Sequence, residues 1–456
     1  MHANAIRPAG ARYGRHGAER SPTGLPGISG PHPNLSRTNP FRSPGSGPQR
    51  GRLRPGPPFR LLFFFAKNAV FWVLERRGGC PCAPPLPTQP GDTGIRRFLD
   101  IALLLCLTAA APDLGAEEPE PYFYRGHTYG SEAVINPLTT VINGGFGILQ
   151  ISNRSNDLST VDFGAGLRNV TWNLSHPFRT IDQYGWGNFL SREVIPGSVK
   201  IKSSQFYPNY YNHLIGGGFT WRAFGDWFRF HGYPYPRLWA TTFWMGYHLL
   251  NEVVENNAYD GPNVDPIADI YLFNTAGLLL FSSDRVARFF AHTLNLRDWS
   301  FMPAYDPWRN SIENNGQNFM ARVRIPGADR LSLMYHWGVH GMYGLSYHRA
   351  DGNTLSLSGG LVVKDLVETD NDTGVRELTA TLVWTGGVFW DRDGSLLASL
   401  ILSGTKGYRG RLNVYPGVVR LGRFSPALSA TLLKNNAVVL GLTTGGLPFG
   451  LARRVR

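Results

Sequence analysis

The last third of the chain alternates between apolar and polar residues, and this pattern limits the folds that it can adopt. In residues 331–337, Leu, Leu, Tyr and Trp are separated by Ser, Met and His. Similar segments of about 9–11 residues follow, divided by turn signals such as Asp351-Gly352-Asn353. Because successive side chains of a strand point to opposite faces, residues 317–446 are predicted to form about eight antiparallel strands.

Two architectures show such alternation, a water-soluble β-sandwich or sheet and a transmembrane β-barrel. The strand lengths, the aromatic ends and the small polar residues of the alternate face favour the barrel. Outer-membrane barrels usually end on an aromatic residue that the assembly machinery reads, whereas this chain ends Arg453-Arg454-Val455-Arg456. We predict a mainly β fold, an antiparallel transmembrane β-barrel of about eight or more strands within residues 295–456, with His336 and His348 in its polar interior.

The first 94 residues differ from the rest. They are rich in Pro, Gly and Arg and lack hydrophobic periodicity, so we expect residues 1–94 to be a disordered, non-native extension. Arg96-Arg97 then precede the apolar run 98–107, and Leu114-Gly115-Ala116 supply small residues for cleavage. Residues 95–116 are therefore interpreted as a secretory signal peptide, although no Met lies between Met1 and Met245.

Export changes the charge and the chemistry of the chain. Residues 1–116 carry 15 Lys and Arg and 5 Asp and Glu, so their removal leaves 30 basic and 27 acidic residues and lowers the net charge from +13 to about +3. A nucleic-acid partner is therefore not expected. Cys80, Cys82 and Cys106 also lie in this part, which excludes disulfides and cysteine nucleophiles from the mature protein. An exported chain that is poor in charge and rich in aromatic residues suits the bacterial outer membrane.

Residues 117–236 have an unusual density of aromatic side chains, Trp186, Trp221 and Trp227 among them. Their Gly-rich segments, 143–148 and 161–166, fit either strands or loops. We expect an aromatic-rich strand and loop region at a membrane–water boundary, where amphipathic rings are favoured. A large soluble aromatic core is the alternative.

Residues 237–294 are predicted to form a helical insert. His248, Glu252 and Glu255 fall at i, i+4 and i+7 and therefore share one stripe of a helix that is apolar nearly all round. Carboxylates are rarely buried without a partner, because removing a charge from water is costly. Glu252 and Glu255 therefore need compensating groups.

A second helix is predicted after the breaker 260–262. Asp265 suits its N-cap, Pro266 suits its first turn, and the helix extends to about Phe281. A third, shorter helix begins at Ser283-Asp284. We expect the first two helices to form an antiparallel hairpin, with the carboxylates of the first near its turn and Asp265 opposite them.

The second helix carries three further polar or small residues. Asn274 and Gly277 lie at i and i+3 on one stripe, and Gly277 allows another backbone to approach closely. Asp269 lies about 140° around an α-helical axis from Asn274, so the two are not expected on one stripe.

Three short segments carry a resemblance to a known family: Asn212-His213-Leu214-Ile215-Gly216-Gly217, Asn251-Glu252-Val253-Val254-Glu255, and Asp265 and Asp269 followed by Asn274-Thr275-Ala276-Gly277. They resemble an uncharacterised family of bacterial outer-membrane proteins, a domain of unknown function. That family pairs a His-Pro-x-x-Gly segment, a Trp-Glu-x-x-x-Glu helix and an Asn-Asp … Gly helix. VanZ-like membrane proteins are similar more distantly. Here Asn212-His213-Leu214 replaces His-Pro, and Asn251 replaces Trp. The resemblance implies a cell-envelope location and a helical hairpin, in which His213, Asp265, Asn274 and Gly277 form the structural motif, but no known reaction.

Two interpretations of the polar residues remain open. In one, His248, Glu252, Glu255 and Asp269 form a catalytic site that holds a divalent metal or supplies a general acid and base to a lipid headgroup. In the other, they bond to each other, to Arg222 or Arg237 and to the exposed helix N-terminus, and they lock the hairpin. The HExxH and GxSxG motifs and a phosphate-binding Gly loop are absent. No cofactor is expected other than such a metal.

Three functions follow from these interpretations. The leading one is a non-enzymatic structural or transport role in the outer membrane, with membrane lipid, lipopolysaccharide and the outer-membrane assembly machinery as partners. The second is a membrane-embedded enzyme that modifies lipid or lipopolysaccharide through His248 and Glu252. The third is a soluble periplasmic ligand-binding β-protein.

Overall fold

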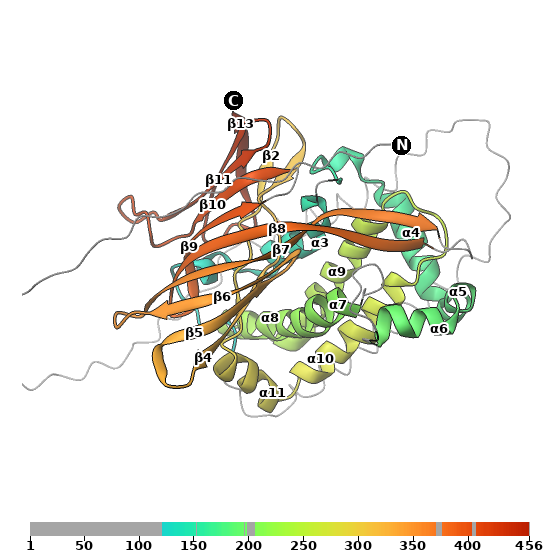
Figure 1. Ribbon diagram of the computed structural model, residues 1–456, viewed down its shortest axis with the longest axis horizontal. Helices are drawn as coiled ribbons and strands as arrows, with labels where there is room; N and C mark the ends of the chain where they lie inside the picture. The colour runs from blue at the N-terminus through green and yellow to red at the C-terminus, as the bar shows by residue number, and fades with distance from the viewer. Residues whose placement is uncertain are drawn as a thin grey trace, which may run out of the picture. The chain divides into compact units, whose positions relative to one another are not determined.

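The structure is a computed structural model that describes residues 121–455, except for residues 152, 196, 198–205, 371–375 and 404–406. The extension predicted at residues 1–94 and the signal peptide predicted at residues 95–116 lie outside the described residues. Within the described chain, a helical region is followed by a large β-sheet (Figure 1).

A mostly antiparallel sheet of 13 strands forms the C-terminal part, so the protein is mainly β with helices. From β4 to β13 each strand pairs with the next, while β1 pairs with β4, and β2 lies between β13 and β3 in a parallel pairing with β13. The strands are β1 (Arg297–Asp298), β2 (Ala304–Asp306), β3 (Ser311–Glu313), β4 (Phe319–Ile325), β5 (Ala328–Trp337), β6 (His340–His348), β7 (Asn353–Asp370), β8 (Arg376–Arg392), β9 (Ser395–Ser403), β10 (Tyr408–Val414), β11 (Pro426–Leu433), β12 (Val438–Thr444) and β13 (Gly450–Val455).

The sheet is open, with β1 and β3 as its edges, so the closed barrel predicted from the sequence is not formed by the described residues. Residues 297–306 pair with β4 through β1 and with β13 through β2, but residues 299–303 between them form no strand. There Asp298 Oδ1 accepts a hydrogen bond from the Ser300 amide, and Ser300 Oγ accepts one from the Asn318 amide. These side-chain bonds lie where the regular strand pairing ends, although the Trp299 and Phe301 amides still donate to the Asn318 and Gly316 carbonyl oxygens.

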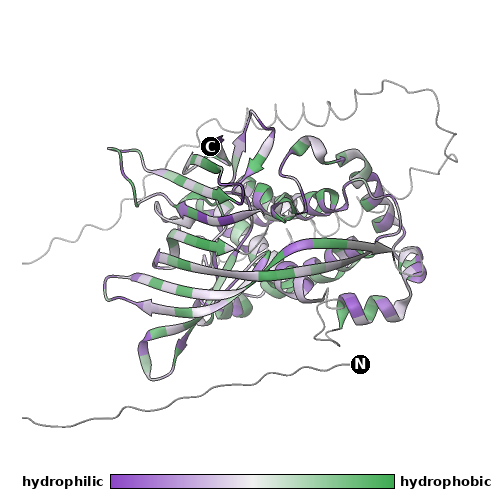
Figure 2. Ribbon diagram, turned by 45° about the horizontal axis from the view of Figure 1, so that its top comes forward, coloured by the Kyte–Doolittle hydropathy of each residue, from purple (hydrophilic) through white to green (hydrophobic). Residues whose placement is uncertain are grey.

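One face of the sheet exposes apolar side chains to the surroundings. A continuous row crosses β4 to β10, in which each residue pairs with the next and is 42–66% exposed: Val323, Leu333, Leu345, Leu357, Val388, Leu400 and Leu412. We call this set the apolar row. The alternation along the strands is visible in Figure 2. A face of this kind is unusual for a sheet that meets water.

The opposite face of the sheet is buried and carries a row of mostly polar residues. The neighbouring row is made of paired residues that are all buried: Ser332, Ser346, Ser356, Phe389, Ser399, Asn413 and Ser429. Arg322 crosses this face, donates to Ser346 Oγ and forms an ion pair of 2.7 Å with Asp391. His348 Nε2 lies 2.7 Å from Ser332 Oγ, and buried His336 lies 2.6 Å from His340. The inner face therefore combines these polar residues with a buried apolar cluster, while the outer face is apolar. The cluster includes Met320, Met334, Met342, Phe389 and Ile401.

The region before the sheet is helical. Its α-helices are α3 (Pro137–Gly145), α4 (Phe163–Ser175), α5 (Pro177–Tyr184), α6 (Trp186–Phe189), α7 (Phe206–Pro208), α8 (Gly218–Phe230), α9 (Pro236–Asn256), α10 (Thr275–Phe281) and α11 (Asp284–Arg288). Four π-helical segments join them: η5 (Leu190–Val194), η7 (Asn209–Gly217), η8 (Ile267–Asn274) and η9 (Phe289–Thr293). Short 3-10 turns are η2 (Ser131–Val134), η3 (Gly147–Gln150) and η4 (Leu158–Thr160). Among the described residues, no helix combines the length and the apolar character that a membrane span requires.

The strand and loop region predicted at residues 117–236 is thus wrong, because helices α3 to α8, with the 3-10 and π-helical segments between them, occupy most of its described residues. Two start signals in the sequence point to these helices. Asn136 caps α3 by accepting from the Thr139 amide, with Pro137 in the first turn, and Asp162 caps α4 by accepting from the Ala165 amide. The Gly-rich segments that resembled loops lie inside or beside these helices.

The first predicted helix of the insert is confirmed as α9, but the hairpin is more complicated than expected. Helix α9 packs mainly against α8, α3 and α4, whereas η8 and α10 pack mainly against η7 and α8. The first predicted helix (α9) and the second (η8 with α10) therefore approach each other near the turn that joins them. Elsewhere α8 packs against both α9 and α10, and η7 packs against η8 and α10. The third predicted helix corresponds to α11 and η9.

Candidate functional site

A group of polar side chains lies where α9, η7 and η8 meet. We call it the helical cluster and define it as His213, His248, Glu252, Asp265, Asp269 and Asn274. On α9, His248 and Glu252 are buried as their shared stripe predicts, while Glu255 is half-buried. Segments that are distant in sequence thus bring the predicted residues together.

His213 on η7 connects the two polar residues of η8. Its Nε2 lies 3.0 Å from Asp269 Oδ2, and its Nδ1 lies 3.2 Å from Asn274 Oδ1. The expectation that Asp269 and Asn274 lie on different stripes is therefore wrong. Residues 267–274 form a π-helix, in which hydrogen bonds from i to i+5 turn residues five apart towards one side. Such segments are rare and are frequent at functional sites.

The protonation of this pair follows from its burial. Burial lowers the pKa of His213 to about 4. Burial, and then the neighbouring carboxylates Asp265 and Glu252, raise the pKa of Asp269 well above its usual value. The His213 imidazole is therefore neutral near neutral pH, and it contacts both Asp269 Oδ2 and Asn274 Oδ1.

Three carboxylates lie close enough to share one ion. Single oxygen atoms of Glu252, Asp265 and Asp269 all lie within 4.8 Å of one another. The predicted N-cap role of Asp265 is wrong: Asn263 Oδ1 accepts from the Asp265 amide, so Asp265 belongs to the first turn and its carboxylate belongs to the cluster. Glu255, which the sequence placed in the same site, is not part of this close group.

Several polar atoms in the cluster are buried without a hydrogen bond. They are both ring nitrogens of His248, Nδ2 of Asn274 and Oδ1 of Asp269. His248 and Asn274 are each 1% exposed. The His248 ring lies 5.6 Å from that of His213, and burial and the neighbouring imidazole lower the pKa of His248 well below its usual value. Unsatisfied buried groups are uncommon in folded proteins and call for an explanation.

Two glycines allow the helices around the cluster to approach. A Cβ atom on Gly277 would collide with the Leu214 carbonyl oxygen, and one on Gly218 would lie 2.6 Å from the Gly277 carbonyl oxygen. The close backbone approach predicted at Gly277 is confirmed. Gly217 lies at the centre, because its Cβ would be 3.1 Å from Asn274 Oδ1 and 3.2 Å from His248 Nε2.

Sequence reasoning missed one carboxylate near the cluster. Glu193 on η5 is buried, and burial raises its pKa to about 7, although Asn209 Nδ2 donates to its Oε2 at 3.4 Å. Its charge also contributes to the raised pKa of Asp269. No spacing in the sequence pointed to Glu193. Arg222, which was expected to pair with the cluster, instead pairs with Asp226 and Asp284.

A second buried polar group, also missed, joins the start of the described chain to the sheet. We call it the Glu132 network, made of Arg125, His127, Glu132 and Ser395. Glu132 accepts from the Arg125 and His127 amides and from the Arg125 guanidinium at 3.0 Å, and its own amide donates to Ser395 Oγ. His127 Nδ1 lies 3.6 Å from Glu132 Oε2.

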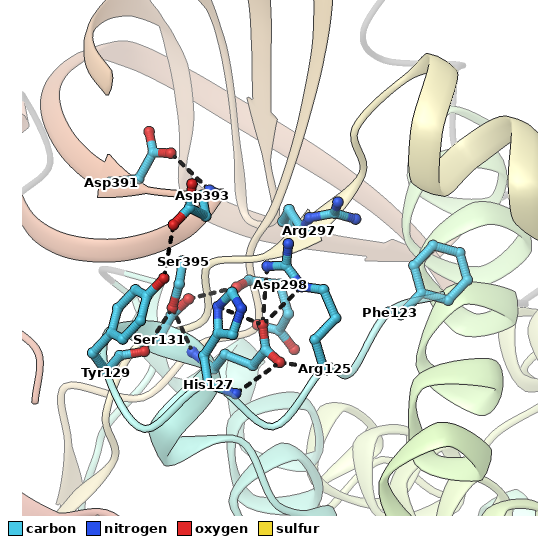
Figure 3. A network of polar contacts seen from close by, with 12 residues as sticks. Phe123, Arg125, His127, Tyr129, Ser131, Arg297, Asp298, Asp391, Asp393 and Ser395 are labelled. Carbon is cyan, nitrogen blue, oxygen red and sulfur yellow. Dashed lines mark hydrogen bonds and ion pairs between the residues drawn. The ribbon is translucent and has the colours of Figure 1, made fainter. Parts of the chain in front are cut away.

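Residues around the Glu132 network extend the same connection. Figure 3 shows Tyr129 bonded to Asp393, and its hydroxyl donates to Asp393 Oδ2 at 2.9 Å. Ser395 Oγ donates to the Tyr129 carbonyl, and Ser131 Oγ donates to the Asp298 carbonyl. The network therefore fastens residues 125–132 to β1 and to the turn between β8 and β9.

No protein-family model matches the chain, and no curated protein or solved structure matches it either. The geometry described above is thus the basis for the functional conclusion.

Proposed function

We propose that this protein is an exported component of the bacterial outer membrane, with the apolar face of its sheet against lipid hydrocarbon and with a non-enzymatic structural or transport role. The apolar row carries this proposal. Seven paired Leu and Val side chains across β4 to β10 are 42–66% exposed, while the neighbouring paired row is buried and almost entirely Ser and Asn. Strands of outer-membrane proteins alternate in this sense, apolar towards lipid and polar towards the interior.

Water is an unfavourable surrounding for such a face. Soluble monomers rarely expose contiguous apolar patches larger than a few hundred Å². Contact with lipid tails removes this cost, because the apolar row then leaves water. Unpaired strand edges are costly in lipid, and the short edge strands β1 and β3 limit the number of unpaired backbone groups.

Quenching of tryptophan fluorescence by brominated lipid tests the proposal. Trp384 on β8 is 60% exposed and pairs with Leu361, which is exposed on the same face. In vesicles of dibrominated phosphatidylcholine we expect the full chain to be quenched relative to ordinary vesicles, and W384F to lose part of that quenching. W186F, which removes an exposed ring on α6, is the control and should keep it.

Extraction behaviour gives the opposing outcome. A protein that fractionates without detergent and shows no quenching by brominated lipid would contradict the proposal and favour a soluble periplasmic ligand-binding protein. Quenching that survives W384F but disappears in W186F would place the helical region, not the sheet, in lipid.

One observation favours a second function, a membrane-embedded enzyme that modifies lipid or lipopolysaccharide. His248 has two ring nitrogens without hydrogen bonds beside buried carboxylates, as a general base would. The cluster is nearly closed to solvent, so a lipid headgroup would need the helices to part. Loss of lipid turnover in H248N with an unchanged melting temperature would support the enzyme, and unchanged turnover would exclude it.

A further inference from the structure

We propose that the helical cluster binds a divalent cation through the carboxylates of Glu252, Asp265 and Asp269, with His213 holding Asp269 in place. The inference goes beyond the role of the sheet, because it concerns only the helical region and holds in detergent as well as in lipid.

The spacing of the three carboxylates fits one ion. Their nearest oxygen atoms lie within 4.8 Å of one another. Oxygen ligands lie roughly 2.0–2.6 Å from Mg²⁺ or Ca²⁺, so two ligands on opposite sides of an ion are about 4–5 Å apart. The carboxylates therefore need little movement to become ligands. They come from two elements, α9 and the turn that begins η8, which are fixed by the packing of η7.

The two oxygens of Asp269 have different surroundings. Oδ2 contacts His213 Nε2 at 3.0 Å, whereas Oδ1 is buried without a hydrogen bond. His213 is in turn oriented by Asn274 Oδ1 on its other nitrogen. Metal-binding side chains are commonly held by such a chain of outer hydrogen bonds, which orients them and tunes their affinity. His213 and Asn274 are therefore positioning residues, and Asp269 Oδ1 is the ligand atom.

A second, independent observation points to an occupant of this space. His248 lies one helical turn before Glu252, is 1% exposed, and directs its Nε2 towards the point above Gly217 that Asn274 also approaches. Neither of its nitrogens has a hydrogen bond, and Asn274 Nδ2 has none. A buried polar atom without a partner destabilises the folded protein, because it has lost its hydrogen bonds to water. A hydrated cation would supply water molecules as partners for these atoms.

The donor atoms select the kind of metal. Carboxylate oxygens suit Mg²⁺, Ca²⁺ and Mn²⁺, whereas soft metals prefer thiolates, which the described residues do not contain. We therefore assign the site to a hard divalent cation. Mn²⁺ is a convenient probe, because its free form is counted directly by electron paramagnetic resonance.

The test uses the full chain, purified in detergent, stripped with EDTA and titrated with Mn²⁺. We expect one bound Mn²⁺ per chain that excess Ca²⁺ or Mg²⁺ displaces. D269N should weaken binding at least tenfold, because it removes the anionic ligand. Asparagine has the same size as aspartate and can still hydrogen-bond to His213, so the fold is expected to survive; circular dichroism and thermal melting check this. D182N, the same change at an exposed aspartate of α5, should bind like the wild type.

N274A tests the positioning residues. It frees His213 without removing a ligand, and we expect a tenfold loss of Mn²⁺ affinity with little change in melting temperature. Two results would overturn the proposal: wild-type protein that binds no Mn²⁺, or D269N that binds Mn²⁺ as tightly as the wild type. Neither result affects the lipid-quenching experiment, so the two proposals can fail separately.

Discussion

The two buried polar groups of this protein differ in how completely they are bonded. In the Glu132 network, the central carboxylate accepts from two amides and a guanidinium. In the helical cluster, His248, Asn274 and Asp269 each keep a buried polar atom without a hydrogen bond. The Glu132 network also has one buried atom without a hydrogen bond, His127 Nδ1, but its central carboxylate is bonded, whereas such atoms in the helical cluster belong to His248, Asn274 and Asp269. A bonded centre fits a structural connection, and several buried donors and acceptors without partners fit a place where a ligand can bind.

Replacement of Glu132 by alanine should cause the largest loss of stability. It leaves the Arg125 and His127 donors buried or half-buried without their acceptor, and breaking such a network costs about 3–5 kcal/mol. Urea unfolding followed by circular dichroism measures this loss. R349A, which breaks an exposed ion pair with Asp351, is the control and should change little. Equal effects of E132A and R349A would show that the Glu132 network is not a stabilising connection.

The pH dependence of stability near the helical cluster should be the next largest effect. The pKa of Glu193 rises from 4.5 to about 7 because of burial, so the folded state holds this proton more tightly than the unfolded chain. Stability from this group is therefore greatest below pH 4.5 and falls as the pH rises to about 7, by up to about 3 kcal/mol.

The variant E193Q isolates this effect, since glutamine keeps an acceptor for Asn209 and does not titrate. We expect the difference in unfolding free energy between E193Q and the wild type to grow between pH 4.5 and 7. A difference that stays constant over this range would show that Glu193 titrates normally.

Substitution of Gly277 by alanine should have a smaller effect that is specific to the helical cluster. Its Cβ meets the Leu214 carbonyl oxygen, so η7 must move away from α10, at a cost of about 1–3 kcal/mol. G246A on α9 is the matched control, because a Cβ there meets nothing within 4 Å and alanine favours a helix. Thermal melting should show opposite shifts for the two variants, and a stabilising G277A would contradict the close approach.

The smallest effect on stability is expected for D269N in metal-free protein. The substituted amide preserves the hydrogen bond to His213, so the unfolding free energy should change by less than about 1 kcal/mol. Compared with E132A, this small change would separate a binding site from a structural connection. A loss as large as that of E132A would instead make Asp269 part of the framework.

The sequence predicted those features that depend on periodicity. Period-two alternation located strands such as β5 and β6, and the stripe of His248 and Glu252 located α9 and its buried face. Local start signals at Asn136 and Asp162 were present but were overshadowed by nearby glycines, so helices α3 to α8 were missed.

Other features depend on contacts that no local pattern encodes. The π-helical form of residues 267–274 placed Asp269 and Asn274 on one side, and an α-helical projection could not show this. Closure of a sheet depends on pairing between its edge strands, here β1 and β3, and the alternation of residues along each strand does not specify that pairing. The partners of Glu132 include Ser395, more than two hundred and fifty residues away along the chain.

The outward-facing leucines have a consequence for how the protein is handled before it reaches its final position. Once the strands pair, the seven side chains of the apolar row form a hydrophobic surface that can associate with the same surface of another copy. A chain that folds in water is therefore expected to aggregate through this surface. Under the membrane location proposed above, the chain must be kept unfolded by a binding protein until it meets lipid, and that protein should recognise the Leu-rich strands of the apolar row.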